Sequence, residues 1–215
     1  MDSKTLVEGL LFYVGLVVLL TFHEFGHAWM ALKCGDDTAQ SQGRVSLNPL
    51  VHIDWIGTVA MPLLMIFSSP GLARFMVGWA KPVPVNLSNL RNPKMDDALV
   101  TLAGPWMNLL LAVVLMGLAR LGLQFGLSGM VDFCGRTAHL SLLLCFFNML
   151  PIPPLDGSRI ARIIIGMSYE TYWRISRFGF VILIIAIQFP FVRGPVASLT
   201  NKSYNLIADW FGVPV

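Results

Sequence analysis

This sequence has few charged residues and few cysteines. Charged side chains make up 13% of its 215 residues, about half the share of an average soluble domain. Hydrophobic residues make up 55%, and the mean hydropathy is +0.68. This composition excludes an intrinsically disordered chain, a coiled coil and a nucleic-acid-binding module. The net charge of +3 is small, and we interpret it as information on membrane topology rather than as a basic patch for a polyanion.

The three cysteines exclude a disulfide framework, and their spacing matches no zinc knuckle. They are Cys34, Cys134 and Cys145. Any metal ion must therefore be held by histidines and carboxylates. Cys34 is expected to be a small buried residue.

Long apolar runs account for most of the chain. A helix needs roughly 20 apolar residues to cross a bilayer, and the run 6–32 is long enough. It is too long for a signal peptide, and no small-residue cleavage site closes it. The further apolar runs are 53–67, 98–119, 137–155 and 178–192. They predict an all-α polytopic membrane protein with about four to six transmembrane helices and short extended or re-entrant segments near the active site.

The remaining segments predict loops and one terminal helix. Segments 34–52 and 68–97 are rich in Gly, Pro, Asn and Asp, and the two prolines of 78–86 (GWAKPVPVN) favour extended neighbours. The tail 196–211 places apolar side chains near one helical face, which predicts an interfacial helix. With no internal repeat, the chain reads as a single integral-membrane domain over 1–215, with its core at about 5–190.

Residues 23–27 read His-Glu-Phe-Gly-His. At about 100° per residue, His23 and His27 lie within roughly 40° of each other on a helix, so both imidazoles could bind one zinc ion. Glu24 is then placed to contact a metal-bound water. Alternatively, the pattern arises by chance and both histidines only form hydrogen bonds within a helix bundle. Ionisable groups in an apolar span are costly and usually functional, which favours the metal site.

A third metal ligand must come from elsewhere in the chain, and the candidates are His52, His139, Asp54 and Asp156. Asp156 is best placed, because three prolines in 148–155 interrupt the helix before it. Irregular backbone at membrane depth occurs only within protein or beside a water-filled cavity. Asp156 could equally cap the next helix, and the residues alone leave both roles open. His52 and His139 are expected to be interfacial or packing residues.

Beyond the His-Glu-Phe-Gly-His motif, the chain resembles the site-2 protease family of intramembrane zinc metalloproteases. AGPWMN at 103–108 is similar to its Gly-Pro-x-x-Asn element, and NMLPIPPLDG at 148–157 is similar to its Asn-x-x-Pro-x-x-x-Leu-Asp-Gly element. Segments 43–57 and 78–86 resemble the compact branch of the family, which lacks PDZ and CBS domains. The resemblance covers roughly residues 5–190, with no departure at a metal or catalytic position.

The resemblance implies a zinc metalloendopeptidase that hydrolyses peptide bonds within or near transmembrane segments, as in regulated intramembrane proteolysis. One Zn2+ per chain would be bound by His23, His27 and Asp156, with Glu24 as the general base. The partners would be a single-span membrane protein or peptide as substrate and the lipid bilayer, with no nucleic acid. The sequence favours no particular oligomeric state.

The resemblance also makes Asn108 and Asn148 candidates for holding the substrate backbone. Hydrogen bonding between helices, which is common for Asn in membranes, is the alternative for both. The segments 43–50 and 80–87 could pair with an unwound substrate as an added strand.

Two other classes of protein compete with a protease. A catalytically silent scaffold of the same fold would be expected to lose its base first, yet Glu24 is intact. A metal transporter would need ionisable groups along a path, yet 98–119 and 178–192 contain none.

Zinc geometry predicts the topology. His27 and Asp156 both lie towards the C-terminal ends of apolar runs and must reach one metal, so an even number of crossings separates them. Because 98–119 and 137–155 supply two, 53–67 must re-enter or return through 70–86. Re-entry places ten basic residues on one side and five on the other, against nine and six for a full crossing. The ten are Lys33, Arg44, Arg74, Lys81, Arg91, Lys94, Arg159, Arg162, Arg174 and Arg177.

The positive-inside rule then predicts a cell-membrane protein with its N-terminus outside and its zinc nearer the cytosol. Single cysteines at Ser41 and Asn92, in an otherwise cysteine-free chain, should both react with an impermeant thiol reagent from the cytosolic face. Labelling of the two positions from opposite faces would contradict re-entry.

Overall fold

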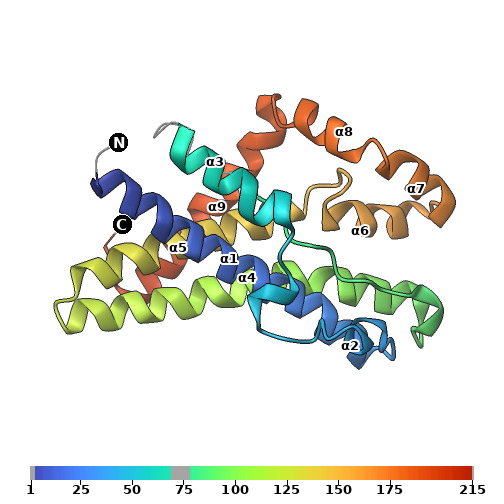
Figure 1. Cartoon of the computed structure of the whole chain (residues 1–215), viewed down its shortest axis with the longest axis horizontal. Helices are drawn as coiled ribbons and strands as arrows, with labels where there is room; N and C mark the ends of the chain where they lie inside the picture. The colour runs from blue at the N-terminus through green and yellow to red at the C-terminus, as the bar shows by residue number, and fades with distance from the viewer. Residues whose placement is uncertain (1–2, 69–77, 215) are drawn as a thin grey trace.

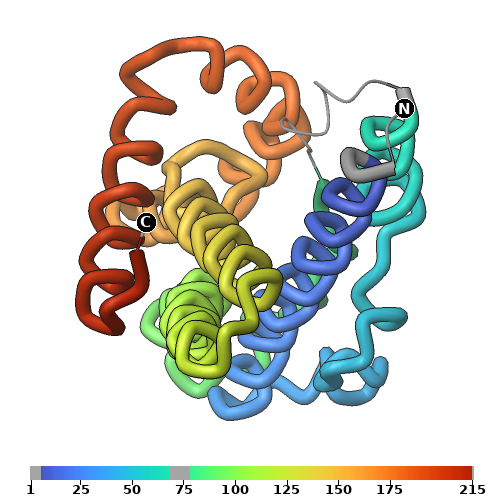
Figure 2. The backbone as a smooth tube through the Cα atoms, turned by 90° about the vertical axis from the view of Figure 1, so that its left-hand side faces the viewer, coloured from blue at the N-terminus to red at the C-terminus, as the bar shows by residue number. Residues whose placement is uncertain are grey.

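The computed structural model describes residues 3–68 and 78–214, and within these ranges the chain is helical with no β-strand. Three long helices, α1 (Ser3–Lys33), α4 (Pro93–Gln124) and α5 (Ser128–Asn148), pack against one another in the centre of the molecule (Figures 1 and 2). The shorter elements are α2 (Thr38–Ser41), η1 (Pro49–Val51), η2 (Trp55–Ala60), α3 (Met61–Ser68), η4 (Leu87–Asn89), α6 (Asp156–Ile165), α7 (Tyr169–Ser176), α8 (Gly179–Ala186) and α9 (Pro190–Phe211).

The three long helices are long and apolar enough to cross a membrane, as Leu6–Lys33, Pro93–Gln124 and Ser128–Asn148. The α8 and α9 helices pass the same test together, but they are bent by 80° and form either a broken span or a re-entrant turn. The described residues therefore contain three candidate spans, or up to four if the bent pair counts as one. These helices confirm the predicted class of an all-α polytopic membrane protein.

Prolines set three helix boundaries near the predicted runs, and two of these boundaries differ from the prediction. The loop predicted over 68–97 ends early, because Pro93 occupies the first turn of α4 and Asp96 accepts the Asn92 N–H at 2.7 Å. The interruption predicted from the prolines of 148–155 is observed, because the α5 helix ends at Asn148. The run 178–192 is divided at the bend before Pro190, where α9 begins.

The apolar stretch 53–67 forms two short pieces rather than one long helix. A π-helical turn, η2, begins after Asp54, whose carboxylate accepts the Ile56 and Gly57 N–H groups, and α3 follows it. The helical stretch Trp55–Phe67 is shorter than the roughly 20 residues that a span requires. Residues 69–77, which contain Arg74 and part of the possible return through 70–86, lie outside the described residues, so re-entry stays a prediction.

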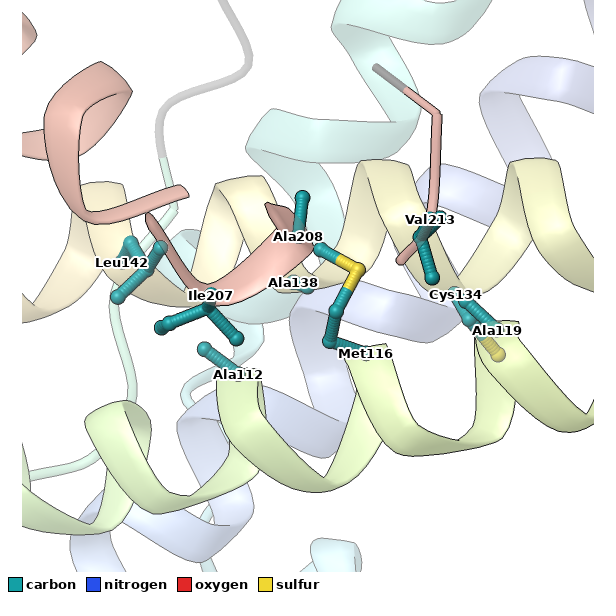
Figure 3. Close-up of a cluster of buried hydrophobic side chains, with 9 residues drawn as sticks. All are labelled: Ala112, Met116, Ala119, Cys134, Ala138, Leu142, Ile207, Ala208 and Val213. Carbon is teal, nitrogen blue, oxygen red and sulfur yellow. The ribbon is translucent and has the colours of Figure 1, made fainter. Parts of the chain in front are cut away.

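Small side chains allow α4, α5 and α9 to approach closely. Their shared core contains Ala112, Met116, Ala119, Cys134, Ala138, Leu142, Ile207, Ala208 and Val213 (Figure 3). Between helices in lipid, close backbone approach and van der Waals contact supply most of the attraction. The alanines in this cluster are fully buried, and they account for the tight contact between α4 and α5.

The tail predicted as an interfacial helix over 196–211 lies within the longer α9. The predicted apolar face is divided, because Val196 and Ile207 are buried in the protein. Leu206 and Trp210 are 71% and 78% exposed. The helix therefore packs along α5 and α4 on one side and presents apolar side chains outward on the other. An interfacial position for these outward side chains stays a prediction.

Candidate metal centre

The two histidines of the His-Glu-Phe-Gly-His motif lie on one face of α1, in its C-terminal third. Both side chains are buried. Their Nε2 atoms are 3.1 Å apart, and the ring planes meet edge to face at 85°. Both Nε2 atoms therefore reach the same point between the helices.

Asp156 reaches this point from the far end of the chain. It is the first residue of α6, after the irregular stretch 149–155, and its Oδ2 lies 3.1 Å from His23 Nε2 and 3.3 Å from His27 Nε2. Gly157 makes this approach possible, because a Cβ there would overlap the Met149 carbonyl. The N-cap of α6 is Leu155, so Asp156 does not serve as the cap.

The neighbouring histidines favour the ionised form of the Asp156 carboxyl. Burial alone would raise its pKa, but His27 and His23 outweigh burial through charge and hydrogen bonding and lower the pKa. An anionic oxygen beside two imidazole nitrogens is a donor set that suits zinc.

The spacing of the three ligand atoms fits a tetrahedral metal. Ligands at about 2.0–2.1 Å from zinc lie about 3.3 Å from one another. The His23, His27 and Asp156 atoms are separated by 3.1–3.3 Å. Among the described residues they form the one group of three or more His, Cys, Asp or Glu side chains close enough to bind a metal ion.

The α4 helix packs against both imidazoles. The Val100 carbonyl lies 2.7 Å from His27 Nδ1 and accepts its N–H, which leaves Nε2 free for a metal. Gly104 faces both rings, where a Cβ would overlap them. Asn108 lies 3.2 Å from His23 Nδ1 and is fully buried. Val100, Gly104 and Asn108 recur every four residues, so one face of α4 contacts both histidines.

The side-chain amide of Asn108 contacts His23 through Nδ2, while its Oδ1 has no hydrogen-bond partner within the described chain. Rotating the amide by 180° places Oδ1 beside Nδ1, which can then donate, as a histidine that binds metal through Nε2 requires. His23 Nδ1 and Asn108 Oδ1 are then paired as donor and acceptor. The backbone carbonyl of Asn108 accepts the Ser141 hydroxyl at 2.6 Å, which ties this part of α4 to α5.

Glu24 is half-buried and points to the extended stretch 78–86. Its Oε2 accepts the Val83 N–H at 3.1 Å. The stretch is itself anchored, because Trp79 N–H donates to Gly57 O at 3.3 Å and Lys81 N–H to His52 O at 2.9 Å. Sequence reasoning missed this contact between Glu24 and Val83, although the prolines at 82 and 84 correctly predicted an extended backbone.

A second contact that sequence reasoning missed comes from Arg44. Its side chain is buried, and Nη2 donates to the carbonyls of Lys81 and Pro82. The burial of Arg44 and its partners follow from the tertiary structure, and the sequence around Arg44 carries no signal for them. Arg44 holds the same stretch whose Val83 N–H contacts Glu24.

The other sequence candidates lie elsewhere. His52 Nε2 contacts the Ser46 carbonyl, Asp54 caps η2, and His139 contacts Asn201 of α9. Asn148 donates its amide to Leu144 O, one turn back in α5, at 3.0 Å. Cys34 is buried, as expected.

Comparison with known proteins identifies the family. The family model described as peptidase family M50 matches residues 11–139 and 123–186. The chain is 36% identical over 206 residues to "Putative zinc metalloprotease YwhC" of Bacillus subtilis (strain 168), covering 92% of this chain and 89% of the relative. It is 34% identical to "Putative zinc metalloprotease Rip2" of Mycolicibacterium smegmatis, covering 67% of this chain and 56% of that protein. No solved structure matches.

The archaeal relative "Putative zinc metalloprotease MJ0611" of Methanocaldococcus jannaschii is 28% identical over 160 residues. The family match spans the histidine motif of α1 and the Asp156 region, so it includes all three residues of the candidate metal centre. Zinc is the metal named for these relatives. The chain therefore belongs to peptidase family M50, the site-2 protease family of zinc metalloproteases.

Proposed function

We propose that this chain is an intramembrane zinc endopeptidase that hydrolyses peptide bonds within or near the transmembrane segments of single-span membrane proteins. The observation that carries the proposal is the convergence of Asp156 with His23 and His27 beside Glu24. The two histidines and Glu24 lie on a helix long and apolar enough to cross a membrane. Ionisable groups at such a place are costly to bury and are usually functional.

His23, His27 and Asp156 would hold the metal, and their three atoms leave one tetrahedral position open. Bound there, zinc would acidify a water molecule and polarise the scissile carbonyl. Glu24 would take the proton from this water and pass it to the leaving amine. The Val83 N–H holds one Glu24 oxygen at 3.1 Å, which orients the carboxylate and leaves its other oxygen for the proton.

The extended stretch 78–86 is the proposed surface for an unwound substrate. A helical peptide bond is shielded by its own hydrogen bonds, so cleavage requires an extended segment near Glu24. Pro82 and Pro84 have no N–H, and the N–H groups of Trp79, Lys81 and Val83 are already bonded within the protein. A substrate strand would therefore bind here by donating its own N–H groups to carbonyls of the stretch. The carbonyls of Trp79, Lys81 and Pro82 already accept from Thr58 and Arg44, which leaves those of Val83 and Pro84 as the proposed acceptors. Residues 43–48 contain turns rather than an extended run, which makes them less suited to this role.

The orientation that we propose has the N-terminus outside and the metal centre nearer the cytosol. The distribution of basic residues supports it.

The metal site is tested by zinc content. Purified protein should contain about one zinc per chain, and His23→Ala, His27→Ala and Asp156→Ala should each lower the content sharply, because each removes one of three ligands. His139→Ala, which removes a histidine between α5 and α9, is the matched control and should retain zinc. Full zinc content in Asp156→Ala would show that the third ligand lies elsewhere.

The chemistry is tested by Glu24→Gln, which keeps the shape of the side chain and removes the base. With purified enzyme and a panel of single-span membrane peptides, cleavage should be abolished by a chelator and should fall at least about a hundredfold in this variant. Zinc content should stay at the wild-type level. Glu170→Gln, at an exposed position of α7, should cleave normally. Substantial cleavage by Glu24→Gln would remove this residue from the mechanism.

We also propose that Asn108 orients His23 instead of holding the substrate backbone. Asn108→Ala should weaken zinc binding by about 10–100-fold, measured by competition with a chelator, because His23 Nδ1 loses its partner. Asn148→Ala, which removes an amide that donates to Leu144 O of its own helix, is the control and should bind zinc normally. Normal zinc affinity with a raised KM in Asn108→Ala would instead indicate substrate binding.

A further inference from the structure

A buried ion cluster connects the two helices behind the candidate metal centre. The Asp97 side chain lies in the second turn of α4 and is 1% exposed. Arg159 Nη2 lies 2.5 Å from its Oδ1, and Arg162 Nη2 lies 2.5 Å from its Oδ2. A buried carboxylate is tolerated only when it is paired and hydrogen-bonded, and each of its oxygens has a guanidinium here.

The two arginines lie on the helix that begins with Asp156. Arg159 and Arg162 are three residues apart on α6, so they project from neighbouring positions of one face. Arg159 also lies about 60° around the helix from Asp156. Two attachments to one carboxylate restrict both the rotation of α6 about its axis and its distance from α4. Either movement would displace the Asp156 oxygen.

The backbone hydrogen bonds that precede Asp156 do not connect it to α4. Within 149–155 the backbone hydrogen bonds are local, such as Leu150 N to Phe147 O and Leu155 N to Ile152 O. The start of α6 is also held by Ser158, whose hydroxyl contacts Leu155 O and the Tyr172 hydroxyl of α7. These contacts connect α6 to its own surroundings, whereas Asp97 connects it to α4.

The α4 helix is also the one that holds both histidines, through the Val100 carbonyl and Asn108. Asp97 precedes Val100 by three residues and so lies on the same face of α4. All three candidate ligands are then positioned from one helix, two by direct contacts and one through α6.

We propose that Asp97 is a positioning residue for the metal centre, which sets Asp156 at ligand distance from His23 and His27 through Arg159 and Arg162. The proposal rests on the metal site of the proposed function. A positioning role differs from a purely structural role in one respect: loss of the cluster must change zinc affinity in protein that is still folded.

Asp97→Asn is the direct test, because it keeps the side-chain shape and removes the charge. Zinc affinity, measured by competition with a chromophoric chelator, should fall by about 10–100-fold, the range expected for residues that orient metal ligands. Asp132→Asn, at an exposed position of α5, is the matched control and should bind zinc as wild type does. Wild-type affinity in Asp97→Asn would overturn the proposal, even if its thermal stability falls.

If Asp97→Asn does not fold, the proposal is tested with Arg162→Gln and Arg159→Gln instead. Each of these variants leaves Asp97 with one guanidinium. Each should weaken zinc binding less than loss of both, and Arg174→Gln on α7 is the control. In a double-mutant cycle, the variant that combines Asp97→Asn with Arg162→Gln should bind zinc no more weakly than Asp97→Asn alone. Unchanged affinity in both arginine variants would overturn the proposal.

Hydrogen exchange of residues 156–165 separates this proposal from the function it rests on. In metal-free protein, Asp97→Asn should increase exchange in α6, because the helix loses its attachment to α4. Unchanged exchange would overturn the attachment. If the wild-type protein takes up no zinc, the proposed function fails, and the positioning of a metal ligand fails with it, whatever the exchange shows.

Discussion

A metal site made from two separate helices depends on a third element that holds both, and here that element is α4. His23 and Asp156 are separated by 133 residues, yet their ligand atoms lie 3.1 Å apart. One face of α4 contacts His27 through Val100 and His23 through Asn108, and it pairs with α6 through Asp97. Because the interior of a helix bundle is rigid, this common support sets distances that a flexible loop could not.

The physical cost of polar groups in an apolar setting explains where the irregular backbone lies. The described residues that leave regular helix near the site are 78–86 and 149–155. In the first stretch, the alternate N–H groups of Trp79, Lys81 and Val83 donate to Gly57 O, His52 O and the Glu24 carboxylate. In lipid an unsatisfied backbone group costs several kcal/mol. Residues 78–86 therefore need these acceptors, and the hydrogen bond from Val83 also orients Glu24.

Packing around the site combines close helix contacts with an open apolar exterior. Alanines and Gly26 bring α1, α4 and α5 close together, since a Cβ at position 26 would overlap the Ala103 carbonyl. Large apolar side chains such as Trp106 and Leu110 point outward from α4. Such a surface fits a lipid solvent, because burial of apolar groups from water is not the main attraction between helices in a membrane. Close contact between small residues stabilises the arrangement.

The amino-acid sequence by itself determined the features that depend on local spacing. Periodicity places His23, Glu24 and His27 on one turn, long apolar runs give the central helices, and the prolines at 82 and 84 give an extended backbone. The partners of these groups lie far along the chain: Val83 is 59 residues from Glu24, and Asn108 is 85 residues from His23. Only the tertiary structure decided those pairings. It also decided the contact of Asp97 with α6 and the position of Asp156, which does not cap the helix. Contacts between distant segments depend on how the helices pack, and local sequence patterns carry no measure of that packing.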